Sequence, residues 1–184
     1  MQKLNQQPDI CPYFSPEFKV IPQYIIMKEG ECMELNNRTT SFFIFILSGE
    51  ITISFEQYTN RSVLENEMFF LPKNNCFKWK AVTQTVLILT GYNATIFPCT
   101  SVRARILYKI KAGVKFDCRG VVMKDEVKVV VNQMKHYLES GINCHHMYIL
   151  KHKELYLMFK HFYTYEEIVQ IFYLTLGSNP LFNE

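Results

Sequence analysis

Imidazole side chains, which could bind a metal or act as a general base, occur only in the second half of the chain. All five histidines lie there, at His136, His145, His146, His152 and His161. No two of them are four residues apart and HExxH does not occur, so no helix face presents the paired imidazoles of a zinc enzyme. His145 or His146 could bind a stray divalent ion together with His152, two helical turns further on. Solvated or interface histidines are the simpler interpretation, and we predict no metal site and no cofactor.

Candidate nucleophiles have no partners that the sequence can identify. The six cysteines are scattered without a CxxC pair, and in a reducing cytoplasm they are expected as small buried hydrophobic residues. Cys76 lies near three lysines that could lower its pKa, but a packed cysteine in an aromatic segment is the simpler interpretation. Ser48-Gly49 indicates a turn rather than a catalytic serine, since the GxSxG motif does not occur. We therefore predict no catalytic residue and no enzymatic activity.

Composition limits the class of protein. The 184 residues have a net charge of +3 and suit one large domain, or a medium domain with an appended module. Basic residues between positions 103 and 119 mostly alternate with apolar ones, which is typical of the solvent side of a strand, so residues 102–110 are predicted to be extended. The chain is not expected to hold DNA by itself. Without a signal peptide or an 18-residue apolar stretch, we expect a cytoplasmic protein with no membrane contact.

Between residues 18 and 90 the sequence pattern predicts β-strands. Residues 42–47 form a continuous apolar run, typical of a strand covered on both faces. In residues 51–55 apolar and polar side chains alternate, as expected when one face is in water. With Ser48-Gly49 between them, these two segments predict a β-hairpin.

Further short segments continue the series. Residues 58–61 are expected to form a polar turn, residues 68–71 a short strand that ends at Pro72, and residues 84–90 a last strand. In residues 77–81 the aromatic side chains alternate with lysines, so the aromatic rings are expected to point inward. Short strands at this spacing predict a sandwich or a barrel.

Helical periodicity begins near residue 125. Apolar residues recur at helical spacing from Val127 to Leu138, and Gly141 is expected to end this helix. A second helix is predicted over residues 144–162. The third is predicted to begin with a capping box of Thr164 and Glu167. Tyr163 and Ile168 stand where a hydrophobic staple would, and Gly177 and Pro180 are expected to end the helix.

These helices carry more apolar surface than the outer face of a barrel can easily cover. A small helical subdomain packed on the barrel would explain this, and so would a subunit interface about a two-fold axis; both can hold together. We predict a homodimer through the C-terminal helices. The expected interface residues are Met147, Leu150, Leu155, Met158, Phe159 and Phe162.

A frame of turn residues extends from Gly30 to Phe77. The positions are Gly30, Asn36, Arg38, Phe42, Gly49, Asn66, Pro72, Asn74 and Phe77. This frame resembles that of the cupin family, which has two histidines, a glutamate and a third histidine where this chain has Asn36, Arg38, Phe42 and Phe77. A divalent ion needs three or four N, O or S ligands at about 2 Å. Arg38 repels a cation and phenylalanine has no lone pair, so the barrel is predicted to lack its metal.

With its helical tail, the chain resembles the N-terminal sensory and dimerisation half of a bacterial AraC-type transcription regulator. Residues 153–181, with Tyr-Glu-Glu-Ile at 165–168 and Gly-Ser-Asn-Pro at 177–180, resemble the segment before the two helix-turn-helix motifs in such regulators from gut bacteria. The resemblance implies an α+β fold: a leader (1–16), a cupin-like double-stranded β-helix or jelly-roll barrel (17–112), and a three-helix linker and dimerisation region (113–184). The DNA-binding domain would follow and is absent from this chain, so DNA contact is expected only through that missing part. Of a sequence cut at the domain boundary and a stand-alone product, the first is favoured.

The function that this resemblance implies is effector sensing and dimerisation. A metal-free barrel can keep a small apolar cavity for an effector. The predicted ligand-binding residues are Asn36, Arg38, Phe42, Phe70, Phe77 and Trp79, of which Arg38 could pair with a carboxylate or phosphate. Alternatively, the aromatic rings fill the barrel and leave no ligand site. The alternative functions are a metal-dependent cupin enzyme and a stand-alone, non-catalytic cupin that acts as a protein-interaction module.

Overall fold

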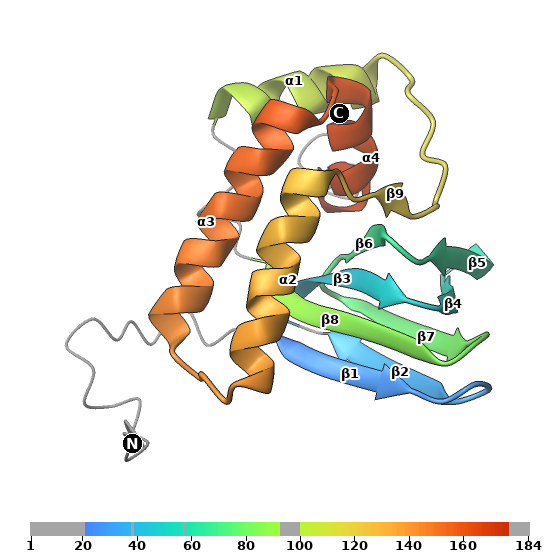
Figure 1. The fold of residues 1–184 in the computed structure, drawn as a ribbon. Helices are drawn as coiled ribbons and strands as arrows, with labels where there is room; N and C mark the ends of the chain where they lie inside the picture. Colours follow the sequence, from blue (N-terminus) through green and yellow to red (C-terminus); the bar gives the residue numbers. More distant parts are fainter. Residues whose placement is uncertain (1–20, 38, 57, 93–99, 177–184) are drawn as a thin grey trace.

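The computed structural model describes residues 21–37, 39–56, 58–92 and 100–176, which form two antiparallel sheets and four helices. The first sheet has the order β1 (Gln23–Met27), β8 (Thr85–Tyr92), β3 (Ser41–Ser48), β6 (Glu67–Leu71) and β9 (Val121–Val122). The second has the order β2 (Cys32–Asn37), β7 (Asn75–Ala81), β4 (Glu50–Phe55) and β5 (Tyr58–Leu64). The two sheets stack to form the body of the molecule (Figure 1).

The first eight strands pair as a nested ribbon. β4 pairs with β5, β3 with β6, β2 with β7 and β1 with β8, all antiparallel. Wound up, this ribbon places strands that follow one another in sequence largely in opposite sheets, which is the arrangement of a jelly roll. The prediction of a jelly-roll barrel within an α+β fold is therefore confirmed.

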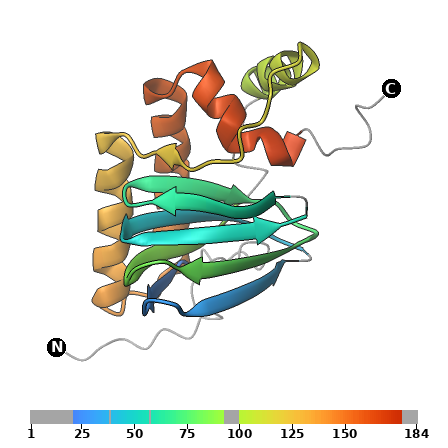
Figure 2. The same cartoon turned by 90° about the vertical axis from the view of Figure 1, so that its right-hand side faces the viewer.

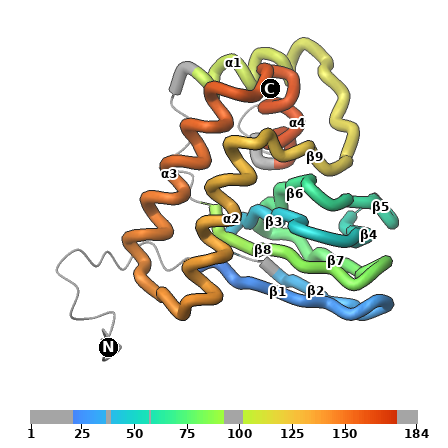
Figure 3. The backbone as a smooth tube through the Cα atoms, in the orientation of Figure 1, coloured from blue at the N-terminus to red at the C-terminus, as the bar shows by residue number. Residues whose placement is uncertain are grey.

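Four helices accompany the barrel, one more than predicted: α1 (Thr100–Lys111), α2 (Asp125–Glu139), α3 (His145–Phe162) and α4 (Tyr165–Leu176). α2 and α3 run side by side, and α1 and α4 lie together at one end of that pair (Figure 3). The capping box is confirmed, because Thr164 N donates to Glu167 Oε2 (2.8 Å) and Glu167 N donates to Thr164 Oγ1 (3.2 Å). The stop predicted at Gly177 and Pro180 lies outside the described residues, as does the leader.

Two apolar cores result from the alternation of side chains along the strands. In β3, Ile44 and Ile46 belong to the barrel interior, whereas Phe43 and Phe45 belong to a second core shared with all four helices. This explains why the run at residues 42–47 is apolar throughout, because both faces of β3 are covered.

Three local predictions were wrong. The segments around Ser48-Gly49 do not form a hairpin, because β3 and β4 lie in different sheets. Gly49 makes the crossing with a φ of +85°, and a Cβ there would lie 2.4 Å from the Gln84 carbonyl oxygen. Residues 58–61 belong to strand β5 rather than to a turn, and residues 102–110 lie in helix α1 rather than in an extended segment.

Candidate functional site

The barrel interior brings together three of the residues predicted to bind a ligand. Phe77 and Trp79 on β7 are buried in the interior core, and Phe42 packs against that core while remaining half-buried. The Phe77 ring lies 4.8 Å from the ring of Phe55 on β4, centroid to centroid. These side chains fill much of the space between the sheets.

The other predicted ligand-binding residues lie elsewhere. Phe70 points out of the barrel, because its neighbours Phe69 and Leu71 take the inward positions of β6. Its ring packs 4.9 Å from Phe43 in the core shared with the helices. Asn36 is exposed on β2, and Arg38 lies outside the described residues.

Among the described residues of the barrel interior, Trp79 has a buried polar group without a hydrogen-bond partner. Its side chain is 2% exposed, and the buried indole Nε1 has no hydrogen-bond partner in the described part of the chain. An unsatisfied buried donor costs about 1–3 kcal/mol. A bound molecule or a water that accepts this hydrogen bond would remove that cost.

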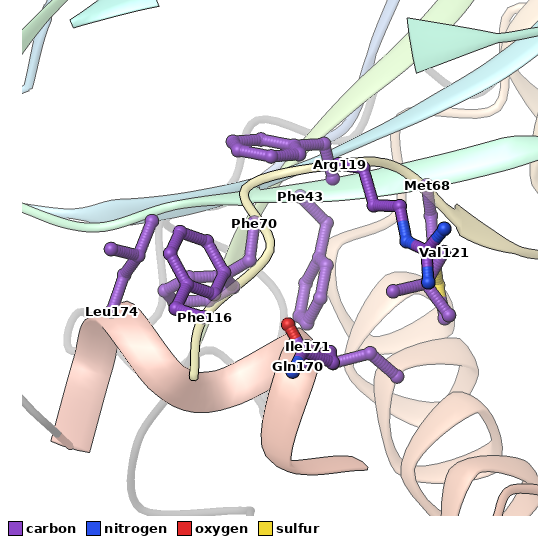
Figure 4. A pocket seen from close by; sticks show the side chains of 10 residues that line it. Phe43, Met68, Phe70, Phe116, Arg119, Val121, Gln170, Ile171 and Leu174 are labelled. Atoms are coloured by element: carbon purple, nitrogen blue, oxygen red, sulfur yellow. The ribbon is translucent and has the colours of Figure 1, made fainter. Parts of the chain in front are cut away.

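A small pocket lies where the barrel meets the helices (Figure 4). Its volume is about 10 Å³, which is room for one water molecule. Aromatic and aliphatic side chains form most of its wall, and the polar contributors are Arg119 and Gln170. The lining residues are Phe43, Met68, Phe69, Phe70, Phe116, Arg119, Val121, Gln170, Ile171 and Leu174.

The segment that covers this pocket was not predicted from the sequence. Residues 114–119, which we call the plug, run from the end of α1 to β9, between α4 and the sheets (Figure 2). Phe116 stacks on Tyr173 of α4 at 5.0 Å and meets Tyr58 of β5 edge to face at 5.8 Å. Cys118 is 1% exposed and belongs to the barrel core, and burial raises its thiol pKa to about 11. Apolar and polar residues alternate from Val114 to Arg119, but this short period-two pattern does not indicate that the segment packs beneath α4.

The predicted interface residues divide into two groups. Leu155 and Phe159 are buried in the core between α3 and the first sheet, so their assignment to a subunit interface was wrong. Met147 and Met158 are half-buried. Leu150 is 62% exposed, and Phe162 is also exposed. Leu157, which was not predicted, is 54% exposed and lies two turns after Leu150.

Among the histidines, His152 differs from the prediction of a solvated or interface side chain. It is 5% exposed, and its Nε2 lies 2.7 Å from Thr90 Oγ1 of β8, which joins α3 to the first sheet. Burial, with a smaller effect from His145, lowers its pKa to about 4. Across the described residues, no group of three histidine, cysteine or carboxylate side chains is arranged to hold a metal ion.

The outer face of the second sheet carries an open groove of about 320 Å³, lined partly by Glu34, Lys78 and Lys80. Cys76 is exposed near it, not packed as predicted, and it donates to Glu34 Oε1 over 3.1 Å. This hydrogen bond to a carboxylate raises the pKa of Cys76, which opposes thiolate formation. In the part of the chain that the structure covers, none of the helices is both long enough and apolar enough to cross a bilayer.

No family model matches the chain, and no curated protein matches it. Among solved structures, a conserved protein of unknown function from Streptococcus pyogenes is similar with 19% identity and a TM-score of 0.37, over 40% of this chain and 64% of that one. A cupin superfamily protein from Desulfitobacterium hafniense has 17% identity and a TM-score of 0.36, over 40% and 68% of the two chains. The CENP-C cupin domain of Drosophila melanogaster has 10% identity and a TM-score of 0.36, over 39% and 56%.

The chain thus spans less than two thirds of the length of the first of these structures. Such likenesses concern the fold alone. The nested pairing of β1 with β8, β2 with β7, β3 with β6 and β4 with β5 independently describes a jelly roll. The described residues contain a jelly-roll barrel with four helices packed against it.

Proposed function

We propose that this chain is the effector-sensing and dimerisation part of an AraC-type transcription regulator, acting in the cytoplasm and without enzymatic activity. The observation that carries the proposal is the single apolar core formed by the first sheet and all four helices. Because Phe43 and Phe70 of the sheet share this core with Ile171 and Phe172 of α4, a change in the barrel alters the packing of the helices. Such coupling is what a sensor needs.

The side chains at the positions of the cupin metal favour a function without catalysis. Of the four cupin metal positions, Phe42 and Phe77 cannot coordinate an ion, and Asn36 is exposed on β2. In the barrel interior the unpaired polar group that we find is the Trp79 indole N–H, which suits hydrogen bonding to an acceptor rather than proton transfer. We infer that an effector would be a small, largely apolar molecule with an acceptor near Trp79.

Dimerisation is proposed through the outer face of α3. Leu150 and Leu157 lie two turns apart on one face and are both more than half exposed, whereas the exposed Phe162 lies about 140° further round the helix axis. In a two-fold dimer the same stripe of each subunit meets its copy, so each apolar side chain finds an apolar partner. A second copy of this chain is therefore the occupant that we propose.

Sedimentation equilibrium tests the dimer. Leu157→Asp should weaken self-association by at least tenfold, because a carboxylate would be buried without a partner. Leu155→Asp is the matched comparison: Leu155 is buried inside the subunit, so this change should unfold the protein instead. A wild-type chain that sediments as a monomer at all concentrations would contradict the proposal.

Effector sensing is tested separately. Native mass spectrometry of protein purified from bacterial cells should show a bound small molecule, and Trp79→Phe should reduce its occupancy because the indole N–H is lost. A signal also requires that the effector shift the dimer dissociation constant, since a ligand acts only through different affinities for two states. If no molecule binds, the sensing part of the proposal fails while the dimer can still hold.

A further inference from the structure

The plug, residues 114–119, is held in the structure by contacts at both of its ends. At the start, Gly113 N donates to the Ile110 carbonyl (3.0 Å) with a φ of +86°, which closes α1. At the far end, Gly120 lies so close to Glu67 that a Cβ would stand 2.2 Å from Glu67 Oε2, and Val121 then pairs with Met68. The plug is therefore a short strap between two fixed points.

Its side chains connect the barrel to α4. Cys118 is buried in the barrel core, and Phe116 lies between Tyr58 of the barrel and Tyr173 of α4. The plug thus contributes apolar side chains to the barrel core and to the surface of α4. Removing the plug would expose both the barrel core and one face of the Tyr173 ring on α4.

One side chain of α4 fastens the plug. Gln170 Oε1 accepts from Asp117 N (3.1 Å), and Gln170 Nε2 donates to the Lys115 carbonyl oxygen (2.9 Å). The single amide replaces the pairing that a neighbouring strand would give to the backbone of the plug. Gln170 also lines the pocket of Figure 4, so the fastening and the pocket share one residue.

The closed plug is also strained. Cys118 has a φ of +46°, a conformation that residues with a Cβ rarely adopt outside sites where the surroundings enforce it. Burial of its side chain and the Gln170 hydrogen bonds oppose this strain. A segment whose central backbone is hydrogen-bonded to a single side chain, and which is strained at its buried residue, is suited to opening without global unfolding.

We propose that the plug is a displaceable lid on the barrel, and that Gln170 couples its position to that of α4. When the plug leaves, α4 loses both hydrogen bonds and the Tyr173 ring contact; when α4 shifts, the plug loses its fastening. The inference deepens the proposed function and rests on it for its biological meaning, since an effector that expels the plug from the barrel would signal to α4 by this route.

Cysteine labelling measures the lid directly, with iodoacetamide as the probe and peptide mass spectrometry as the readout. In the wild type at pH 8, Cys118 should be protected, while the exposed Cys32 labels rapidly and serves as the internal standard. Gln170→Ala removes both fastening hydrogen bonds and should raise the labelling rate of Cys118 by about 10- to 100-fold. Gln133→Ala is the matched control, because Gln133 is an exposed glutamine on α2 that contacts Lys151 and not the plug.

The reverse direction tests the coupling. Phe116→Ala should speed hydrogen exchange of the α4 amides, because coupling between two sites is reciprocal. Should Gln170→Ala fail to fold, Gln170→Glu keeps the acceptor for Asp117 N and loses the donor to Lys115, so an intermediate labelling rate is expected.

The proposal is overturned if Cys118 labels at the wild-type rate in a folded Gln170 variant. It is also overturned if its labelling follows global unfolding, reported by the fluorescence of Trp79, the only tryptophan. Neither result touches the dimer or the binding of an effector, which do not use Gln170, so failure of the lid is distinguishable from failure of the proposed function.

Discussion

The contact between His152 of α3 and Thr90 of β8 predicts how acid affects the stability of the protein. The imidazole is 5% exposed and lies 2.7 Å from the Thr90 hydroxyl. Burial lowers its pKa from the ordinary value of 6.5 to about 4. The folded protein therefore holds His152 neutral at pH values where the unfolded chain already binds a proton.

The magnitude follows from the two pKa values. Above pH 6.5 His152 is neutral in both states and adds no pH dependence. Between pH 6.5 and about 4 only the unfolded state gains the proton, so the free energy of unfolding falls as the pH falls. At 1.36 kcal/mol per unit of pKa, the whole loss is about 3 kcal/mol. This is a large fraction of the roughly 5–15 kcal/mol that stabilises a typical domain.

Urea unfolding followed by Trp79 fluorescence measures this loss, since the single indole reports on the barrel core. The wild type should lose about 3 kcal/mol more than His152→Gln between pH 7 and pH 4, because glutamine can bond to Thr90 and does not titrate. His136→Gln, which alters an exposed histidine on α2, should behave like the wild type. The reasoning is refuted if wild type and His152→Gln lose stability equally over this range, because carboxylates that titrate there affect both proteins alike.

Three further substitutions have definite expectations, each checked by urea unfolding. Gly49→Ala should lower the free energy of unfolding by about 2 kcal/mol or more, because the φ of +85° is unfavourable for alanine and its Cβ would meet the Gln84 carbonyl. An unchanged urea midpoint would contradict the conformation described for Gly49 between β3 and β4. Thr164→Ala should cost about 1 kcal/mol through loss of the cap to Glu167 N, and Ser at this position should restore most of it. Tyr163→Phe should cost about 1–2 kcal/mol, because the hydroxyl donates to the Val122 carbonyl and accepts from Lys124 N; a neutral effect would show that these groups find other partners.

Elements whose structure depends mainly on their own residues were predicted correctly from local patterns. The α4 capping box and the apolar stripe of α2 are complete in the sequence, and both are present in the structure. The segment at residues 102–110 fits two periods, because apolar and basic residues alternate while Val102 and Ile106 are also one helical turn apart. Both side chains pack into the core shared with the other helices, which favours the helix α1 over an extended segment.

Longer-range features could not be read from the sequence. Strand alternation tells that Phe69 and Phe70 point in opposite directions, but both are apolar, so only the fold shows which one faces the barrel. The interface residues on α3 were mispredicted for the same reason. Because this helix is apolar on several sides, the sequence does not show which side the first sheet covers. The plug depends on Gln170, which is more than fifty residues away from its partners, and no local pattern records such a contact.

The nested ribbon has a consequence for the order of events during synthesis. β4 and β5 are neighbours in the chain and can pair as soon as they leave the ribosome, whereas β1 must wait for β8, whose last residue is Tyr92. Contacts between residues so far apart in the sequence make folding slow. β2 remains without a partner until β7 is complete at Ala81, and β1 until β8 is complete, so the nascent chain exposes strand edges on which chaperones can act.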